Sequence, residues 1–357
     1  PLRLVGSEMC IRDSGMEKPA GCFHRFSKTI KVVVIAVLVL LLLIPMVMIE
    51  DMIRERGRTQ VDAIEEVSQK WSLAQTITGP YINLQYPVVS VDNGKQKVSI
   101  GNVLLFPDEL FIDGQLRTEI LKRGIYEVNV YQSELVFKGS FSLEELKKSG
   151  VDLDAMRFDR AAICFNLTDM RGINEQISIM LNDSVYMFEP GMDGRGIKGT
   201  GVHAVADLTA LKENKKLPYE MKIKLKGSQS INFSPLGKTT KVNLKANWGT
   251  PSFTGNYLPD NRNVTENDFS AQWQVLNLNR NYSQVIVDYR NTSARDIDDS
   301  NFGVNLKVPV EQYQQSTRTA KYAILIILLT FTVIFFTEIM EDATRPIMIS
   351  GARKVII

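Results

Sequence analysis

Two long apolar stretches constrain this chain more than any other feature. Residues 32–49 (VVVIAVLVLLLLIPMVMI) run for eighteen positions without a charge, and residues 322–337 (YAILIILLTFTVIFFT) run for sixteen. A helix that crosses the hydrocarbon core of a bilayer needs about 20 apolar residues, with a usable range of roughly 17–25. The first stretch meets this length alone. The second meets it when Thr319 and Ala320 are added and Lys321 extends its side chain to the interface. We therefore expect two transmembrane helices.

Two other structures produce apolar runs of this kind. A buried helix in a soluble core is the alternative for both stretches, and a cleaved signal peptide is the alternative for the first. The first run exceeds the usual apolar region of a signal peptide, which is about 7–15 residues long. Glu50 and Asp51 also follow it where a small-residue cleavage site would stand. An uncleaved membrane anchor is the favoured interpretation.

The basic residues that flank the first stretch predict its orientation. Four precede it, and these are Lys18, Arg25, Lys28 and Lys31. Three follow it closely, and these are Arg54, Arg56 and Arg58. Because basic residues concentrate on the cytoplasmic side of a membrane, this margin favours a cytoplasmic N-terminus. The long segment between the two stretches is then expected to lie outside the cytoplasm.

Charge and cysteine content exclude several classes of function. The formal net charge is only +2 at pH 7 and no run of basic residues is present, so nucleic acid is not an expected partner. Cys10 and Cys22 precede the first apolar stretch, which leaves Cys164 alone between the two stretches. A single cysteine there forms neither an internal disulfide nor a cysteine-based zinc cluster. We expect no metal and no cofactor.

The period of the apolar residues changes along the chain. In residues 50–71 they recur every three or four positions, which predicts a helix that continues out of the membrane. Gly79 and Pro80 are expected to end that region. From Tyr81 onward the period is two, and Asn182-Asp183 is the expected turn of a hairpin in residues 177–188. Further strands are expected at residues 96–106, 125–141, 161–167, 221–225, 230–233, 241–248, 272–278, 285–289 and 302–308.

This pattern favours a β-sandwich-like domain of one or two packed subdomains, with a few short helices. One short helix is expected at residues 142–149, because Ser142 can cap its first turn and Glu145 stands three residues later. The fold class that we predict is therefore a membrane protein with two transmembrane helices flanking a mainly β domain.

A loop rich in glycine, residues 189–203 (EPGMDGRGIKGTGVH, the "glycine loop"), is the main candidate site. Its G-x-G-x-x-G spacing is typical of phosphate cradles, but such a cradle needs a helix after it, and residues 201–205 are expected to be extended. We therefore expect a tight structural loop, or a binding loop, rather than a dinucleotide site. The candidate residues are Gly191, Gly194, Arg195, Gly196, Lys198, Gly199, Gly201 and His203.

Other motifs with chemical potential are weaker. His203 is the only histidine between the apolar stretches, and no G-x-S-x-G nucleophile elbow accompanies it, so we expect no catalytic residues. Asp296, Asp298 and Asp299 crowd one expected loop, for which calcium binding is the alternative to simple solvation. Glu338, at the end of the second stretch, is expected to face the lipid headgroups.

The chain ends have unusual features. Residues 1–15 (PLRLVGSEMCIRDSG) precede Met16 and are typical of translated adapter sequence, and the chain stops eleven residues after Pro346. The predicted segments are 1–15, an adapter-derived segment; 16–31, a cytoplasmic N-terminus; 32–49, a transmembrane helix; 50–71, an amphipathic helix; 72–318, a β-rich periplasmic domain; 319–340, a second transmembrane helix; and 341–357, a truncated cytoplasmic end.

An ordered series of short motifs resembles the CreD family of inner-membrane proteins. The motifs are IPMVMIEDMIRERGRTQV in residues 44–61, TGP in 78–80, RGIYEVNVYQSELVFKGSF in 123–141, DMRGI in 169–173, EPG and GVH in the glycine loop, NWGTPSFTGNYLP in 247–259, and VEQYQQSTRTAKYAILIILLTF in 310–331. Each motif is weak alone, and their shared order carries the resemblance.

The resemblance implies a cellular role. It implies the inner membrane of a Gram-negative bacterium, a periplasmic domain, and expression governed by a two-component envelope-stress response. It also implies a link to cell-envelope integrity, and it carries no catalytic residues. The resemblance further implies transmembrane helices after Pro346. Our leading hypothesis is a non-enzymatic protein that supports envelope integrity by binding, with the lipid bilayer and envelope components or membrane proteins as partners. The alternatives are a ligand-sensing or transport-associated membrane subunit and an envelope hydrolase.

Overall fold

The computed structural model describes residues 21–92, 95–192, 196–197, 199–213, 216–287, 291–306, 308, 318–319, 322–337 and 340. The chain divides into two compact units. One unit contains Pro1–Arg58 and Val310–Ile357, and the other contains Thr59–Pro309. The candidate residues of the glycine loop all fall in the second unit, which is called the β unit below.

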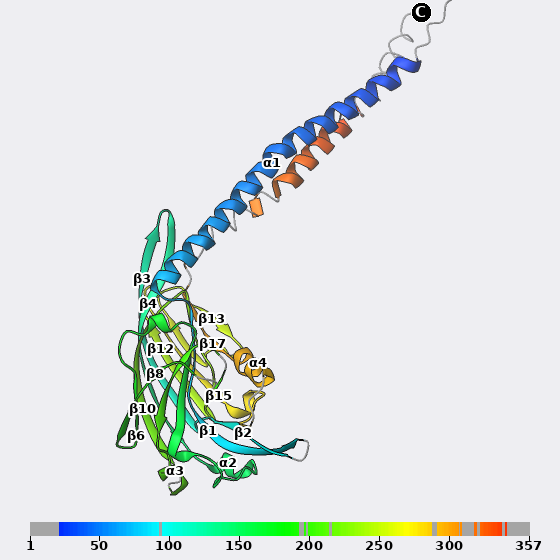
Figure 1. Ribbon diagram of the computed structural model, residues 1–357. Coiled ribbons are helices and arrows are strands. Elements are labelled where there is room, and N and C mark those ends of the chain that lie inside the picture. The colour runs from blue at the N-terminus through cyan, green and yellow to red at the C-terminus, as the bar shows by residue number, and fades with distance from the viewer. Residues whose placement is uncertain are drawn as a thin grey trace, which may run out of the picture. The chain divides into compact units, whose positions relative to one another are not determined.

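The helix α1 (Gly21–Trp71) is 51 residues long and contains the whole first apolar stretch (Figure 1). At 1.5 Å per residue it extends for about 75 Å. It is the one helix in the described part of the chain that is long and apolar enough to cross a membrane. A shorter apolar helix covers Tyr322–Thr337. Its expected extension through Ala320 and Lys321 lies outside the described residues, so a second crossing stays a prediction.

The predicted end of the helix at Trp71 is confirmed, but the break expected at Gly79 and Pro80 is wrong. The helix stops at Trp71, and β1 (Gln75–Asp92) begins four residues later. Gly79 and Pro80 lie inside this strand, where the pairing with the neighbouring strand shifts its register between Thr78 and Tyr81. Glycine and proline within a strand mark such irregular positions, so this pair signals a bulge in β1 and not a helix end.

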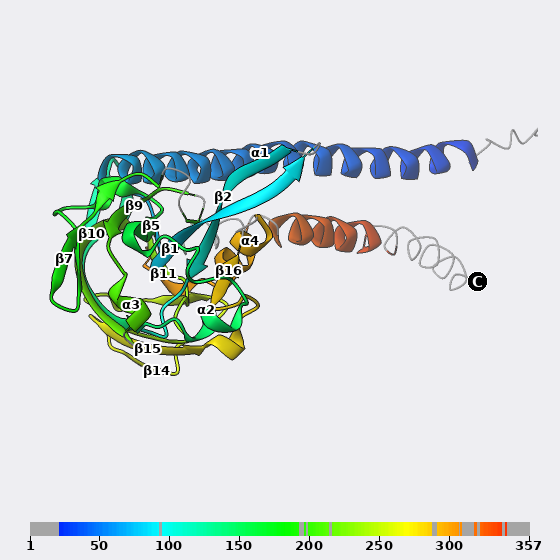
Figure 2. The same cartoon turned by 60° about the horizontal axis from the view of Figure 1, so that its bottom comes forward.

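The β unit contains two sheets. The nine-stranded sheet has β1 near its middle. The first part of β1 pairs with strands on both sides, and its later part pairs with β2 (Lys95–Leu105) in a branch of the same sheet. Figure 2 shows these two strands running on together as a ribbon. The order of the remaining strands is β13 (Ser252–Gly255), β17 (Phe302–Asn305), β11 (Ser230–Phe233), β1, β5 (Ala161–Leu167), β9 (Gly201–Ala206) and β8 (Glu189–Pro190), with β16 (Val285–Val287) paired to β2.

The eight-stranded sheet is built mainly from long strands. Its order is β14 (Asn261–Val264), β15 (Phe269–Leu276), β12 (Thr239–Ala246), β3 (Glu109–Arg123), β4 (Tyr126–Phe141), β10 (Leu217–Ser228), β6 (Ser178–Leu181) and β7 (Ser184–Met187). Two strand pairs are parallel, β12 with β3 and β1 with β11, and the other described pairs are antiparallel. The expectation of a mainly β domain is confirmed, and so is the hairpin that turns at Asn182-Asp183.

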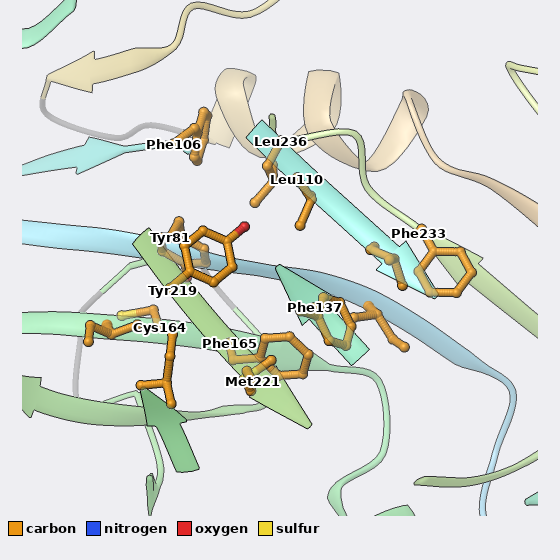
Figure 3. Close-up of a cluster of buried hydrophobic side chains, with 14 of the residues drawn as sticks. Tyr81, Phe106, Leu110, Phe137, Cys164, Phe165, Tyr219, Met221, Phe233 and Leu236 are labelled. Carbon is orange, nitrogen blue, oxygen red and sulfur yellow. The ribbon is translucent and has the colours of Figure 1, made fainter. Parts of the chain in front are cut away.

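The two sheets share one hydrophobic core. Phe137 of the eight-stranded sheet meets Phe165 of the nine-stranded sheet edge to face, with ring centroids 5.3 Å apart (Figure 3). All seven residues of β5 are buried, whereas buried and more exposed residues alternate along most of β10. A core formed by the facing sides of two sheets is the sandwich arrangement. The β unit is therefore one domain rather than two subdomains.

The helices of the β unit differ from expectation in two places. The helix α2 (Glu144–Lys148) begins after Leu143 and has no side-chain cap, so the capping box at Ser142 is wrong. Glu145 instead pairs with Lys238, 2.9 Å away, and with Lys148. The three aspartates expected in a loop lie in or at the end of α4 (Asn291–Asp299). A third short helix is α3 (Ala210–Glu213).

A buried carboxylate joins the end of α1 to the start of β1. Asp169 is 7% exposed and belongs to the DMRGI motif. Its side chain accepts hydrogen bonds from the backbone N–H of Leu73 at 2.9 Å and from the guanidinium of Arg171 at 3.0 Å. The side chain of Gln75 bonds the backbone N–H and C=O of Asp169. Arg171 also donates to the carbonyl of Gln69, in the last turn of α1. These contacts fix the chain where helix gives way to strand.

Three further contacts hold the last turns of α1 against the eight-stranded sheet. The guanidinium of Arg123, at the end of β3, donates to both carboxylate oxygens of Glu66 at 3.0 and 3.2 Å. The indole N–H of Trp71 donates to the carbonyl of Tyr131, and the Lys226 ammonium lies 4.8 Å from the centre of the indole ring. A cation near an indole ring is attracted by the ring's π electrons.

The Asp169 carboxylate predicts how stability depends on pH. Burial alone raises its pKa, but hydrogen bonds from the side chain of Arg171 and from the backbone N–H groups of Leu73 and Arg171 hold the pKa at about 2. Because this pKa is below that of the unfolded chain, the stabilisation is present above about pH 4 and is lost as the pH falls toward 2. We expect Asp169→Asn to cost about 2 kcal/mol at pH 7 and to flatten this acid dependence.

The measurement is urea unfolding of the full chain in an uncharged detergent, followed by circular dichroism between pH 2 and 7. Asp62→Asn is the matched control, because Asp62 is an exposed carboxylate on α1. An acid dependence that is equally steep in Asp169→Asn and in the unaltered chain would contradict this assignment.

Candidate functional site

The glycine loop connects β8 to β9, which pair with each other through Glu189 and His203. The backbone N–H of Gly191 donates to the carbonyl of Gly201 and continues this pairing into the loop. The expectation that residues 201–205 are extended is confirmed by β9. Gly194, Arg195 and Lys198 lie outside the described residues, so their roles stay predictions.

A buried tyrosine holds the middle of the glycine loop against the nine-stranded sheet. The Tyr81 hydroxyl donates to the side-chain oxygen of Asn166 at 2.6 Å and accepts the backbone N–H of Ile197 at 2.8 Å. The side-chain amide of Asn166 donates in turn to the carbonyl of Ile197 at 3.1 Å. Tyr81 and Asn166 come from adjacent strands, β1 and β5. Three hydrogen bonds therefore fix one position of the loop on the sheet.

Gly191, Gly196 and Gly199 of this loop have positive φ, and at Gly196 and Gly201 a side chain would also collide with the sheet. Gly196 has a φ of +83°, and a Cβ placed there would overlap the Tyr81 hydroxyl. Gly201 has an ordinary φ, but a Cβ there would lie 2.6 Å from the carbonyl oxygen of Phe165. Residues other than glycine are strained at positive φ, and a side chain also needs space that these positions lack. The glycines let the backbone lie close to the sheet.

His203 is buried and belongs to the same structure. Its Nδ1 lies 2.7 Å from the carbonyl oxygen of Gly191, so the imidazole bridges the two ends of the loop. Cys164, a buried thiol, is its partner across β5 and β9. In the part of the chain that the structure describes, no group of three His, Cys, Asp or Glu residues is arranged to hold a metal ion. Sequence reasoning did not pair Cys164 with His203, because the pairing of their strands is not visible in the sequence.

A hollow on the eight-stranded sheet is a second candidate site, which sequence reasoning missed. It has a volume of about 280 Å³ and lies where β4 and β10 meet the segment that precedes β6. Its charged lining comes from Glu134, Glu175, Lys222 and Lys224. The ammonium of Lys224 donates to the Glu175 carboxylate at 2.8 Å, and this hydrogen bond raises the pKa of Lys224. The lysine therefore stays charged at neutral pH.

A smaller hollow continues from the first. It has a volume of about 60 Å³ and shares Glu134 and Lys224 with its larger neighbour. The rest of its lining is Gln115, Arg117, Gln132, Ser133 and Asn174. The two hollows form a "polar track" across β3, β4 and β10, lined by charges of both signs and by amide groups. The larger hollow is also lined by Leu135, Val136, Ile177 and Ile223. Such a surface suits a ligand that carries both positive and negative groups or many hydroxyls and amides.

The glycine loop predicts a difference between two similar substitutions. Gly196 and Gly124 both have positive φ, but a Cβ at Gly124 would meet no atom within 4 Å. We expect Gly124→Ala to cost about 1 kcal/mol, from backbone strain alone. We expect Gly196→Ala to cost about 2–4 kcal/mol, because overlap with Tyr81 adds to the strain. Urea unfolding of the full chain in detergent measures both, and equal costs would show that Tyr81 does not pack against Gly196.

Comparisons with known proteins agree on one family. The family model described as inner membrane protein CreD matches residues 27–348. A relative from Escherichia coli (strain K12), the inner membrane protein CreD, is 32% identical over 301 residues. This match covers 83% of the present chain and 65% of that relative, so the chain spans less than two thirds of the relative's length. The chain belongs to the CreD family of inner membrane proteins.

Proposed function

We propose that this chain is a multi-pass protein of the bacterial inner membrane whose β unit lies in the periplasm and supports envelope integrity by binding. The family is one of inner membrane proteins, and α1 is long and apolar enough to cross the bilayer. The basic residues before α1's apolar stretch favour a cytoplasmic N-terminus. If α1 crosses the membrane once from a cytoplasmic N-terminus, the β unit that follows it lies on the periplasmic side.

The polar track is the observation that carries the binding proposal. Most of its lining side chains stand on the adjacent strands β3, β4 and β10, whose pairing sets their spacing, and the rest come from residues 174–177 before β6. Sites built on strands hold their groups more firmly than sites built on loops. Carboxylates, ammonium groups and amides stand within one surface. The matching ligand is a polar envelope component, such as a peptide or an amino-sugar glycan.

The charge state of Lys224 favours binding over catalysis. A lysine that acts as a general base or nucleophile needs a lowered pKa, so that it loses its proton near neutral pH. The pKa of Lys224 is shifted in the other direction by its hydrogen bond with Glu175. A permanently charged lysine suits recognition of a carboxylate or a phosphate group. We therefore infer a non-enzymatic role for this site.

Reporter fusions test the topology. A reporter that is active only in the periplasm, fused after Pro309, should give full activity, because the complete β unit precedes it. The same reporter fused after Met340 should be inactive if Tyr322–Thr337 also crosses the bilayer. An inactive fusion after Pro309 would overturn the periplasmic placement, and activity at both positions would remove the second crossing.

Charge reversal tests the binding role. In a bacterial host that lacks its own copy, variants of the full gene are scored for rescue of detergent and cell-wall antibiotic sensitivity. We expect Lys224→Glu to reduce the rescue at least tenfold at unchanged protein level, because the track loses a cation and its pair with Glu175. Lys147→Glu is the matched control, because Lys147 is exposed on α2.

The double variant Lys224→Glu with Glu175→Lys separates ligand binding from a structural ion pair. It keeps the ion pair but exchanges the positions of the two charges. If the track recognises a ligand, the double variant should fail to rescue as the single variant does. Full rescue by the double variant would show that the ion pair serves only the fold, and the binding proposal would be wrong.

A further inference from the structure

A buried arginine stands in the loop after β15. Arg280 is only 8% exposed, although its neighbours Asn279 and Asn281 are exposed. The next residues continue this alternation, so Tyr282 and Gln284 also point inward. Arg280 therefore lies one layer beneath the surface of a loop, close to solvent but covered by protein.

Most of the hydrogen-bonding capacity of this guanidinium is unused. Its Nη2 donates to the side-chain oxygen of Gln284, whose own amide is fixed by the carbonyls of Pro107 and Leu236. Its Nε and Nη1 are buried and have no hydrogen-bond partner among the described residues. Three N–H groups of the guanidinium, one on Nε and two on Nη1, are left without an acceptor.

No carboxylate of the described residues balances the charge of Arg280. Burial lowers the pKa of this group, and the described groups that act on its charge are the hydroxyls of Tyr282 and Tyr257. The ion pairs found in the described part of the chain do not include it. Burying a charge without a partner raises the free energy of the folded state, and burying N–H donors without acceptors raises it further.

Two aromatic rings lie beside the guanidinium, so its N–H groups are available for hydrogen bonds only along its edge. Its central carbon lies 4.3 Å from the centre of the Tyr282 ring and 5.8 Å from that of Phe106. These two rings pack edge to face on each other, with centroids 5.9 Å apart. An arginine stacked on aromatic rings keeps its N–H groups in the plane of the guanidinium, where oxygen atoms of a planar or tetrahedral anion can accept them.

We propose that Arg280 anchors a binding site for a small oxyanion, a carboxylate or a phosphate group. Oxygen acceptors on such a group satisfy the unused N–H donors, and its charge balances the guanidinium. The site shares no residue with the polar track and does not rest on the function proposed above. Its ligand is a phosphate-bearing or carboxylate-bearing small molecule.

The test uses the full chain in an uncharged maltoside detergent. Inorganic phosphate, acetate and succinate replace chloride at constant ionic strength, and Tm and equilibrium dialysis of labelled phosphate are measured. We expect phosphate or one of the carboxylates to bind saturably in dialysis. We expect the same anion to raise Tm by about 3 °C or more at concentrations well above its Kd, with the rise growing with the logarithm of concentration. The anion that acts at the lowest concentration distinguishes a phosphate site from a carboxylate site.

Three variants locate the effect. Arg280→Met should bind the active anion at least tenfold more weakly in dialysis and should lose most of the rise in Tm at the same anion concentration. Arg280→Lys, which keeps the charge but not the planar donors, should bind with intermediate strength, and it decides the question if the methionine variant does not fold. Arg262→Met is the control, because Arg262 is exposed on β14. An unaltered chain without any saturable response, or an equal response in Arg280→Lys and the unaltered chain, would overturn the proposal.

Discussion

The hydrogen bonds around Asp169 fix where β1 begins, and the nine-stranded sheet of the β unit depends on β1. They fix the backbone of Leu73 and the side chain of Gln75, where α1 has ended and β1 begins. The register of β1 then determines the nine-stranded sheet, because β1 pairs with β11, β5 and β2 along its length. A shift of one residue at this junction would turn Tyr81 to the other face of the sheet. Both the shared core and the anchoring of the glycine loop therefore depend on one buried carboxylate.

The sequence was informative where a local pattern decides the structure. The strands predicted at residues 161–167 and 230–233 have the bounds of β5 and β11, and Asn182-Asp183 predicted a hairpin turn. The apolar run before Ile49 predicted a helix long enough for a bilayer. The errors arose where a distant residue competes with a local preference: Glu145 pairs with Lys238 instead of completing a capping box.

The candidate sites were harder to predict, for a physical reason. The polar track collects residues from strands that are far apart in the sequence, and only the lysines alternating in residues 221–225 indicated that one face of β10 meets solvent. Arg280 gives no signal in the sequence, because nothing there shows that its side chain is buried without a counter-charge. The glycine loop was visible as a motif, yet Gly196 and Gly201 are explained by their close approach to Tyr81 and Phe165, and Gly191 and Gly199 by positive φ.

The parallel pairing of β1 with β11 has a consequence for how the chain is made. Gln75 pairs with Ile231, and β11 is in turn covered by β17, which ends at Asn305. Strands that pair over such distances in sequence form slowly, because a long loop must close before the contact contributes. While the ribosome is still adding the later strands, β1 has no neighbour on the side of β11. Open strand edges of this kind favour misassembly, so the nascent chain is expected to need a chaperone until its last strand has emerged.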